Sequence, residues 1–468
     1  MGIMVTATSS NLRLLVSVVL AFATIGCSSI THKQTVGTSD SSVPRHIAIF
    51  FDGTNNDEAS DTNIKRLHSL VSLQGRSNVN TLYIEGVGTR ADIAGMATGY
   101  GLGERVRIAY NFLLQHHRPG DQVYLFGFSR GAYTARVLNS LLYHAGLPRK
   151  PAKLTHWELT EVIYDLVKVE SDYPAQYEPL RRQRVQDELR TRELGEAPIV
   201  EVELLGLWDT VEALGAPNWL SRIAHKAQIQ QHLADVDNAN SRYGDKLCNV
   251  RHAFHAVSID DNREWIFTPQ LLTRKHLITG CAVNDRPPIL DGNGKLLPDR
   301  LREVWFAGAH SDVGGGYADA RMSGVSLNWM IEEMRNAKMK LLPRKAKVPE
   351  DPYGTSHNPE GGAFSPIYHS INRDLLAYVR SDASLVNHLC VHPSVFKRRQ
   401  FVPVRSHENN QLWLRKPGKA CLKMATQQVR SLDAHGRLEQ FAEADDQCPA
   451  GTGAVLDVRQ SPYCKETP

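Results

Sequence analysis

From residue 45 onward, short runs of apolar residues alternate with longer amphipathic stretches. Five such runs predict buried strands, at 46–51, 80–85, 123–126, 200–208 and 302–307. The stretches between them predict helices, at 104–117, 129–146 and 155–194. This alternation is typical of a mostly parallel sheet with helices on both faces, so we expect an α/β fold.

The segment before this pattern predicts export. Arg13 precedes an apolar run over 14–25, which is too short to span a bilayer but suits the hydrophobic region of a signal peptide. The run ends at Gly26-Cys27, which resembles the lipobox of bacterial lipoproteins, where the Cys is acylated. We predict a signal peptide over 1–27, a lipid on Cys27 and a flexible tether over 28–44. By the same resemblance, Ser28 favours the periplasmic side of the outer membrane.

Composition and charge narrow the possible partners. A net charge of +4 is small for 468 residues, so nucleic acid is not expected as a partner. Past residue 400 the pattern becomes shorter and more polar, which predicts a small appendage over 401–468 with three cysteines. Export permits disulfides, although spacing alone does not select their pairing. No C-x-x-C pair occurs, and we expect neither a metal site nor a cofactor.

The segment 127–131, Gly-Phe-Ser-Arg-Gly, stands between an apolar run and a predicted helix. In α/β hydrolases the motif Gly-x-Ser-x-Gly forms a sharp strand-to-helix turn that exposes the serine hydroxyl, and its glycines leave room for the turn. The alternative is a plain turn in which Ser129 caps the helix. The strand before the motif and the helix after it favour Ser129 as a nucleophile.

In a parallel sheet, catalytic residues lie beyond the carboxyl ends of the strands. Asp209 follows the predicted strand 200–208, and His310 follows the run that ends at Ala309. With Ser129 these residues have the chain order Ser, Asp, His of α/β hydrolases. The His would accept the Ser proton, and the carboxylate would fix the imidazole tautomer. Open alternatives are Asp260 and Asp312 for the acid and His392 for the base.

Acyl transfer also needs hydrogen-bond donors for the oxyanion of the tetrahedral intermediate. The backbone N–H of Arg130 is one predicted donor. The other is expected in the turn after the first strand, at Gly53 or Thr54, although that segment could also be a tight turn and nothing more. The sequence at 52–54 is similar to the Asp-x-Asp-Gly-Thr motif of haloacid-dehalogenase-type phosphatases. Phe50 stands in place of their nucleophilic aspartate, which excludes that chemistry.

Five segments together resemble the α/β-hydrolase-like domain of type VI secretion phospholipase effectors. They are IFFDGTNN at 49–56, GFSRGAYTAR at 127–136, LWDTV at 207–211, HAVSIDDNR at 255–263 and WFAGAHSDVGGGY at 305–317. The resemblance implies an α/β-hydrolase fold and hydrolysis of phospholipid esters, with Ser129 as nucleophile and His310 as base. Those effectors are usually longer and lack a lipoprotein signal.

We therefore expect a catalytic domain over 45–400 that is a serine esterase or lipase, acting on phospholipids in a phospholipase A-type reaction. One alternative is an esterase for another acylated component of the cell envelope. Another is a catalytically silent module that binds lipid or a protein partner. Ser, Asp and His at three strand ends favour the enzyme, because binding alone would not require all three. The sequence does not identify a secretion or immunity partner.

Overall fold

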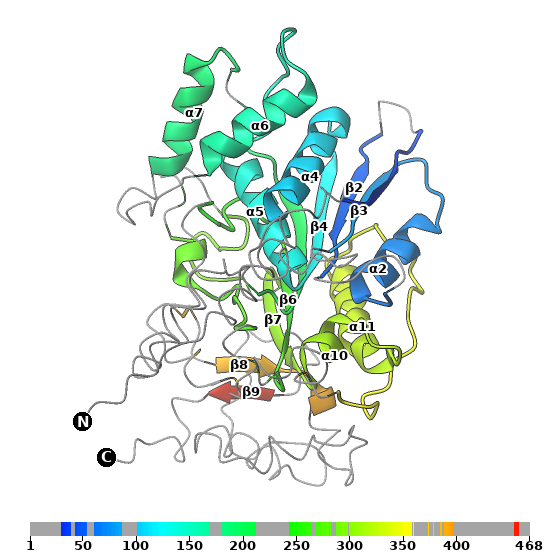
Figure 1. The fold of residues 1–468 in the computed structure, drawn as a ribbon. Helices are drawn as coiled ribbons and strands as arrows, with labels where there is room; N and C mark the ends of the chain where they lie inside the picture. The colour runs from blue at the N-terminus through cyan, green and yellow to red at the C-terminus, as the bar shows by residue number, and fades with distance from the viewer. Residues whose placement is uncertain are drawn as a thin grey trace, which may run out of the picture.

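One nine-stranded sheet organises the part of the chain that the computed structural model describes (Figure 1). Its strands are β1 (His32–Thr35), β2 (His46–Phe51), β3 (Val79–Ile84), β4 (Gln122–Phe128), β5 (Val202–Trp208), β6 (Ala253–Ser258), β7 (Leu301–Phe306), β8 (His388–Val391) and β9 (Ala454–Asp457). The described residues are 30–38, 43–53, 60–86, 101–168, 180–195, 197–211, 243–261, 263, 267–279, 281, 287–297, 299–357, 359, 373, 378, 384–385, 388–395 and 454–457.

The sheet is mostly parallel. Its order is β1-β3-β2-β4-β5-β6-β7-β8-β9, and the seven strands from β3 to β8 in this order are parallel. The edge strands β1 and β9 pair antiparallel with β3 and β8. The predicted α/β fold is confirmed: all five predicted strands are present, and the sheet is α/β-hydrolase-like.

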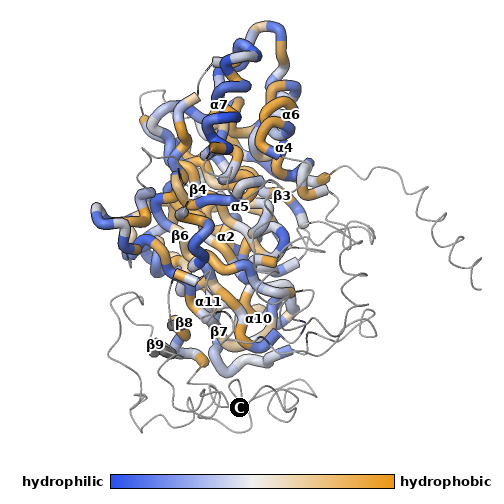
Figure 2. Tube along the Cα trace, turned by 90° about the vertical axis from the view of Figure 1, so that its left-hand side faces the viewer, coloured by the Kyte–Doolittle hydropathy of each residue, from blue (hydrophilic) through white to orange (hydrophobic). Residues whose placement is uncertain are grey.

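Helices cover both faces of the sheet, and each layer has its own apolar core. They are α2 (Asn63–Ser72), α4 (Leu102–His116), α5 (Arg130–His144), α6 (His156–Val167), α7 (Arg181–Thr191), η3 (Lys275–Leu277), α10 (His310–Gly314) and α11 (Arg321–Asn336). Along β2, Ile47 and Ile49 join the core under α4 to α7, whereas Ala48 and Phe50 join the core under α2 and α11. Hydrophilic stretches such as α7 lie on the outside (Figure 2).

Two elements differ from the sequence-based expectations. The segment 155–194 contains two separate helices, α6 and α7, and residues 169–179 between them lie outside the described residues. The predicted tether over 28–44 contains β1, which pairs with β3 from His32 opposite Ile84 to Thr35 opposite Thr81. The polar side chains of β1 are exposed, so it is the open backbone edge of β3, rather than apolar burial, that orders this segment.

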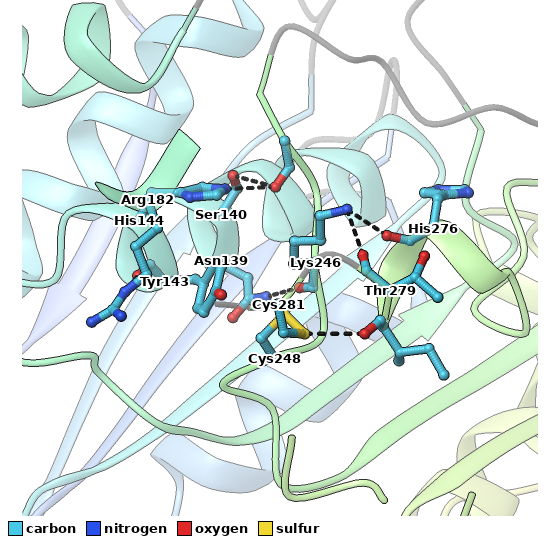
Figure 3. The surroundings of a disulfide bond; sticks show 12 residues. Asn139, Ser140, Tyr143, His144, Arg182, Lys246, Cys248, His276, Thr279 and Cys281 are labelled. Carbon is cyan, nitrogen blue, oxygen red and sulfur yellow. Dashed lines mark hydrogen bonds between the residues drawn. A yellow bond between two sulfur atoms is a disulfide. The ribbon is translucent and has the colours of Figure 1, made fainter. Parts of the chain in front are cut away.

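A disulfide between Cys248 and Cys281 encloses β6 and the chain that follows it (Figure 3). The segment around Cys248 also lies against α5, because Asn139 donates to the carbonyl oxygen of Lys246 at 2.7 Å. A cross-link between residues 33 apart stabilises a fold by about 2–4 kcal/mol, chiefly by restricting the unfolded chain. It therefore helps to hold the chain that leads into β6 in place.

Several predictions concern residues that the structure does not describe. The predicted signal peptide and Cys27 lie outside the described residues, as does most of the segment 401–468. From that segment the structure describes β9, which extends the sheet beside β8. No helix within the described part of the chain is both long and apolar enough to cross a bilayer.

Candidate active site

Ser129 stands at the turn between β4 and α5, with φ 59° and ψ −127°. A positive φ costs a residue with a side chain about 1–3 kcal/mol, so the surrounding structure must impose it. Both flanking glycines are required here. A Cβ on Gly127 would lie 2.4 Å from the Cα of Ala132, and one on Gly131 would lie 2.3 Å from the carbonyl oxygen of Phe51. This is the strand–turn–helix geometry of a nucleophile elbow.

Asp209 follows β5 and also has a positive φ, 38°. Its buried carboxylate is surrounded by donors. Oδ1 accepts hydrogen bonds from the backbone N–H of Ser258 at 2.9 Å and from Arg373 at 2.7 Å. Oδ2 accepts from the Ser258 hydroxyl at 3.1 Å, from Arg373 at 3.0 Å and from Nδ1 of His310 at 2.5 Å. The carboxylate is thus held in one orientation, with His310 at one of its oxygens.

His310 is the first residue of α10 and lies beside the elbow. Its ring packs between Phe128, the residue before Ser129, and Phe267, with ring centroids 4.7 and 4.8 Å away. The N–H of Ser129 in turn donates to the carbonyl oxygen of Trp208 at 2.9 Å. Nε2 of His310 is buried and has no hydrogen-bond partner among the described residues. An imidazole with a carboxylate at one nitrogen and no partner at the other is arranged to accept a proton.

The alternative acids and the alternative base bind elsewhere. Asp260 accepts the N–H of Gly308 at 2.6 Å. Asp312 accepts Nδ1 of His357 at 2.6 Å and the N–H of Ala309 at 3.1 Å. Because Nδ1 of His310 is bonded to Asp209 and its Nε2 is unbonded, neither alternative acid hydrogen-bonds to this imidazole.

His392 lies with its ring stacked on Phe306, at 4.6 Å between centroids, and its Nδ1 is 2.9 Å from the Ser394 hydroxyl. The described contacts of His392 are therefore with the end of β7 and with the chain after β8, whereas the imidazole that packs against Phe128 is that of His310.

The predicted oxyanion donors differ in position. Arg130 is the first residue of α5, so its N–H lies at the helix N-terminus directly after Ser129. The N–H of Gly53 instead donates to the carboxylate of Asp52 at 2.7 Å. It is therefore engaged and does not match the prediction of a donor ready for an oxyanion. Thr54 lies outside the described residues.

Asp52 anchors the turn after β2. Its carboxylate also accepts the hydroxyls of Thr62 and Tyr83, both at 2.7 Å. Burial raises the pKa of Asp52 to about 6, although the hydrogen bonds from Tyr83, Thr62 and Gly53 act in the opposite direction. The backbone of this turn also touches the elbow, because a Cβ on Gly131 would lie 2.5 Å from the Asp52 carbonyl oxygen.

The charges of the site favour an ionised Asp209 and a neutral His310. Burial alone would raise the pKa of Asp209, but the charge of Arg373 and the hydrogen bond from His310 hold it well below its ordinary value. Burial lowers the pKa of His310, and Asp209 and Asp261 offset this only in part. At neutral pH the imidazole is therefore unprotonated, as a general base must be.

A second buried pair supports the backbone at Asp209. Nδ1 of His255 on β6 lies 2.9 Å from Glu303 on β7, and its Nε2 accepts the N–H of Thr210 at 3.1 Å. Because a backbone N–H can only donate, Nε2 carries no proton and Nδ1 donates to Glu303. This pair fixes the backbone N–H of Thr210, the residue directly after Asp209. It thereby helps to hold Asp209 in its conformation with a positive φ.

Three contacts of this site were absent from the sequence analysis: Ser258, Asp261 and Arg373. The first two follow or end β6, a strand that the apolar pattern did not predict. Asp261 accepts the N–H of His310 at 3.1 Å. A search of strand ends would have found both residues if β6 had been recognised. Arg373 has no local signal, because it reaches Asp209 across 164 residues of chain.

The described residues contain no cluster of three or more His, Cys, Asp or Glu side chains arranged to hold a metal ion. The described hydrogen bonds around Asp209 and His310 are made by protein groups: a serine, carboxylates and an arginine.

Comparison with solved structures finds matches at low sequence identity. A crystal structure of an uncharacterized protein from Pseudomonas aeruginosa is 18% identical, with a TM-score of 0.36, and the match covers 74% of this chain and 52% of that one. Esterase 2 of Thermogutta terrifontis with bound butyrate is 11% identical, with a TM-score of 0.34, and the match covers 69% of this chain and 95% of the esterase.

Sequence comparison finds an uncharacterized protein of Saccharomyces cerevisiae that is 23% identical over 435 residues. The match covers 71% of this chain and 62% of the yeast protein, so the chain spans about three fifths of that relative. Residues 45–333 match the family described as the Tle1-like phospholipase effector of type VI secretion systems, catalytic domain. The matched region contains the elbow, Asp209 and His310, and the chain belongs to this Tle1-like phospholipase effector family.

Proposed function

We propose that the protein is a serine esterase that hydrolyses phospholipid acyl esters in a phospholipase A-type reaction. Ser129 attacks the ester carbonyl, and His310 takes its proton and returns it to the leaving alcohol. Asp209 keeps the proton of the imidazole on Nδ1, which leaves Nε2 free to act as base. The N–H of Arg130 donates to the oxyanion, with Thr54 the remaining predicted candidate for a second donor.

The observation that carries this proposal is the buried Asp209–His310 hydrogen bond of 2.5 Å, on an imidazole whose Nε2 has no partner among the described residues and whose ring packs against Phe128, the residue before the elbow serine. A buried nitrogen without a partner is unfavourable and needs an explanation, and accepting a proton from the nucleophile supplies one here. Membership of a phospholipase effector family supports phospholipid as the ester.

Incubation with vesicles of phosphatidylethanolamine and phosphatidylglycerol is expected to release free fatty acid and lysophospholipid, measured by mass spectrometry. Release of the headgroup in place of fatty acid would contradict an acyl-ester reaction. Labelling by a fluorophosphonate without phospholipid hydrolysis would favour an esterase for another acylated envelope component. An absence of both would favour the catalytically silent binding module.

The proposal includes a lipid anchor on Cys27, supported by the apolar run over 14–25 and the residues that follow it. The anchor would hold the protein on the periplasmic side of the outer membrane. Metabolic labelling with a fatty-acid analogue is expected to mark the wild type and to be lost in Cys27→Ser. Equal labelling of both proteins would exclude lipidation at Cys27.

A further inference from the structure

Arg373 contacts the carboxylate of Asp209 directly. Its side chain is fully buried. The two terminal nitrogens donate to the two carboxylate oxygens, at 2.7 and 3.0 Å. They also donate to the carbonyl oxygen and hydroxyl of Ser258 at 2.5 and 2.6 Å, and to the carbonyl oxygen of Phe267 at 2.6 Å. This two-pronged contact fixes the plane of the carboxylate.

The position of Arg373 changes the charge that His310 experiences. In a Ser-His-Asp triad the buried carboxylate stabilises the protonated imidazole. Here the negative charge of Asp209 is already balanced by a cation in direct contact. The other acid at His310, Asp261, is likewise paired with Arg263 at 2.6 Å. Each of the two acids that contact His310 is therefore paired with an arginine before the imidazole is protonated.

We propose that Arg373 is a positioning residue of this site: its guanidinium fixes both oxygens of Asp209, and its charge keeps His310 neutral and able to accept the Ser129 proton. The inference rests on the proposed function for the identity of the base. A buried carboxylate alone would both orient the imidazole and favour its protonated form. Here Asp209 orients His310, and the charge of Arg373 limits how strongly Asp209 favours protonation of His310.

Two substitutions separate the two contributions. Arg373→Lys keeps the charge but loses the two-pronged contact, and Arg373→Gln loses the charge but keeps an amide that donates. The readout is kcat/KM for a soluble p-nitrophenyl ester as a function of pH. The base must be neutral, so activity is lost as the pH falls through the pKa of His310. Because burial lowers that pKa, the wild-type midpoint is expected below 6.5.

In Arg373→Gln the uncompensated Asp209 stabilises the imidazolium, so the midpoint is expected to move to higher pH by about one unit or more. In Arg373→Lys the midpoint should stay close to that of the wild type, whereas kcat should fall roughly tenfold or more with little change in KM. Arg45→Gln is the matched control. It breaks another buried arginine–aspartate pair, with Asp121, at the amino ends of β2 and β4, and should leave the midpoint unchanged.

An unchanged midpoint in a folded Arg373→Gln would overturn the charge role, and full turnover in Arg373→Lys would overturn the orienting role. If Arg373→Gln does not fold, Arg373→Lys still decides the second point. NMR titration of isotope-labelled histidine in a Ser129→Ala background, with His310 assigned through His310→Gln, requires no turnover. This titration tests whether Arg373 lowers the pKa of His310 even if the wild type hydrolyses no ester. Such a lack of hydrolysis would count against the proposed function alone.

Discussion

Ser129→Ala is expected to lose about 10³-fold or more of the esterase activity while keeping the fold, since the members of a triad act as a unit. The substitution removes only a hydroxyl, and the elbow is imposed by Gly127, Gly131 and the backbone around them. The variant should therefore melt within a few degrees of the wild type. A fluorophosphonate should label the wild type and leave the variant unlabelled.

A matched control is Ser140→Ala, which alters another buried serine on the same helix. Ser140 donates to the carbonyl oxygens of Tyr243 and Gly244, so the control removes hydrogen bonds without touching the elbow. It should keep its labelling and most of its activity. Labelling that persists in Ser129→Ala would show that another residue is the nucleophile.

Asp209→Asn is expected to lose about 10⁴-fold in turnover, because the imidazole would be held in the wrong tautomer. The donors around the carboxylate decide how the new amide sits. At the Oδ1 position an amide nitrogen would face two fixed donors, the N–H of Ser258 and the guanidinium of Arg373. At the Oδ2 position there is one fixed donor, the other terminal nitrogen of Arg373, because the Ser258 hydroxyl can rotate and His310 can change tautomer. The amide nitrogen is therefore expected to face His310, which places the imidazole proton on Nε2.

The same substitution should also destabilise the protein, by about 3–5 kcal/mol, because it leaves a buried arginine without its carboxylate. Activity is therefore compared at a temperature where circular dichroism shows the variant to be folded. Asp260→Asn, which alters the carboxylate bonded to Gly308, serves as the control and should keep most of its turnover. A folded, active Asp209→Asn beside an inactive Asp260→Asn would move the acid role to Asp260.

The main strands and the residues at their ends could be predicted because each depends on a local pattern. Buried parallel strands are continuously apolar, and Ser129, Asp209 and His310 each follow one. Strand β6 was missed because two of its six residues, His255 and Ser258, are polar and yet fully buried. Their burial depends on distant partners, namely Glu303 on β7 and Asp209 just after β5. Hydropathy does not record such pairing.

The remaining differences have related causes. Strand β1 has no alternation of apolar and polar residues that would predict a strand. It forms because it pairs with the edge of β3, which only the folded structure reveals. The N–H of Gly53 was a candidate oxyanion donor, but it donates to the side-chain carboxylate of the preceding residue, Asp52. Arg373 depends on charge complementarity between residues that are distant in the chain. Sequence patterns therefore identify the candidate reacting groups, whereas charged partners such as Arg373 emerge only from the folded arrangement.

The pairing of β1 has a consequence for how the enzyme would meet a membrane. His32 pairs with Ile84, the last residue of β3, and the carbonyl oxygen of Ile84 also accepts the N–H of Asp52. The first residue of β1 thus lies at the carboxyl ends of the parallel strands, the end of the sheet at which Ser129 follows β4. Only residues 28–31 separate Cys27 from His32, a reach of roughly 17 Å when extended. A lipid on Cys27 would therefore keep the carboxyl ends of the strands, where Ser129 lies, close to the bilayer that holds the lipid.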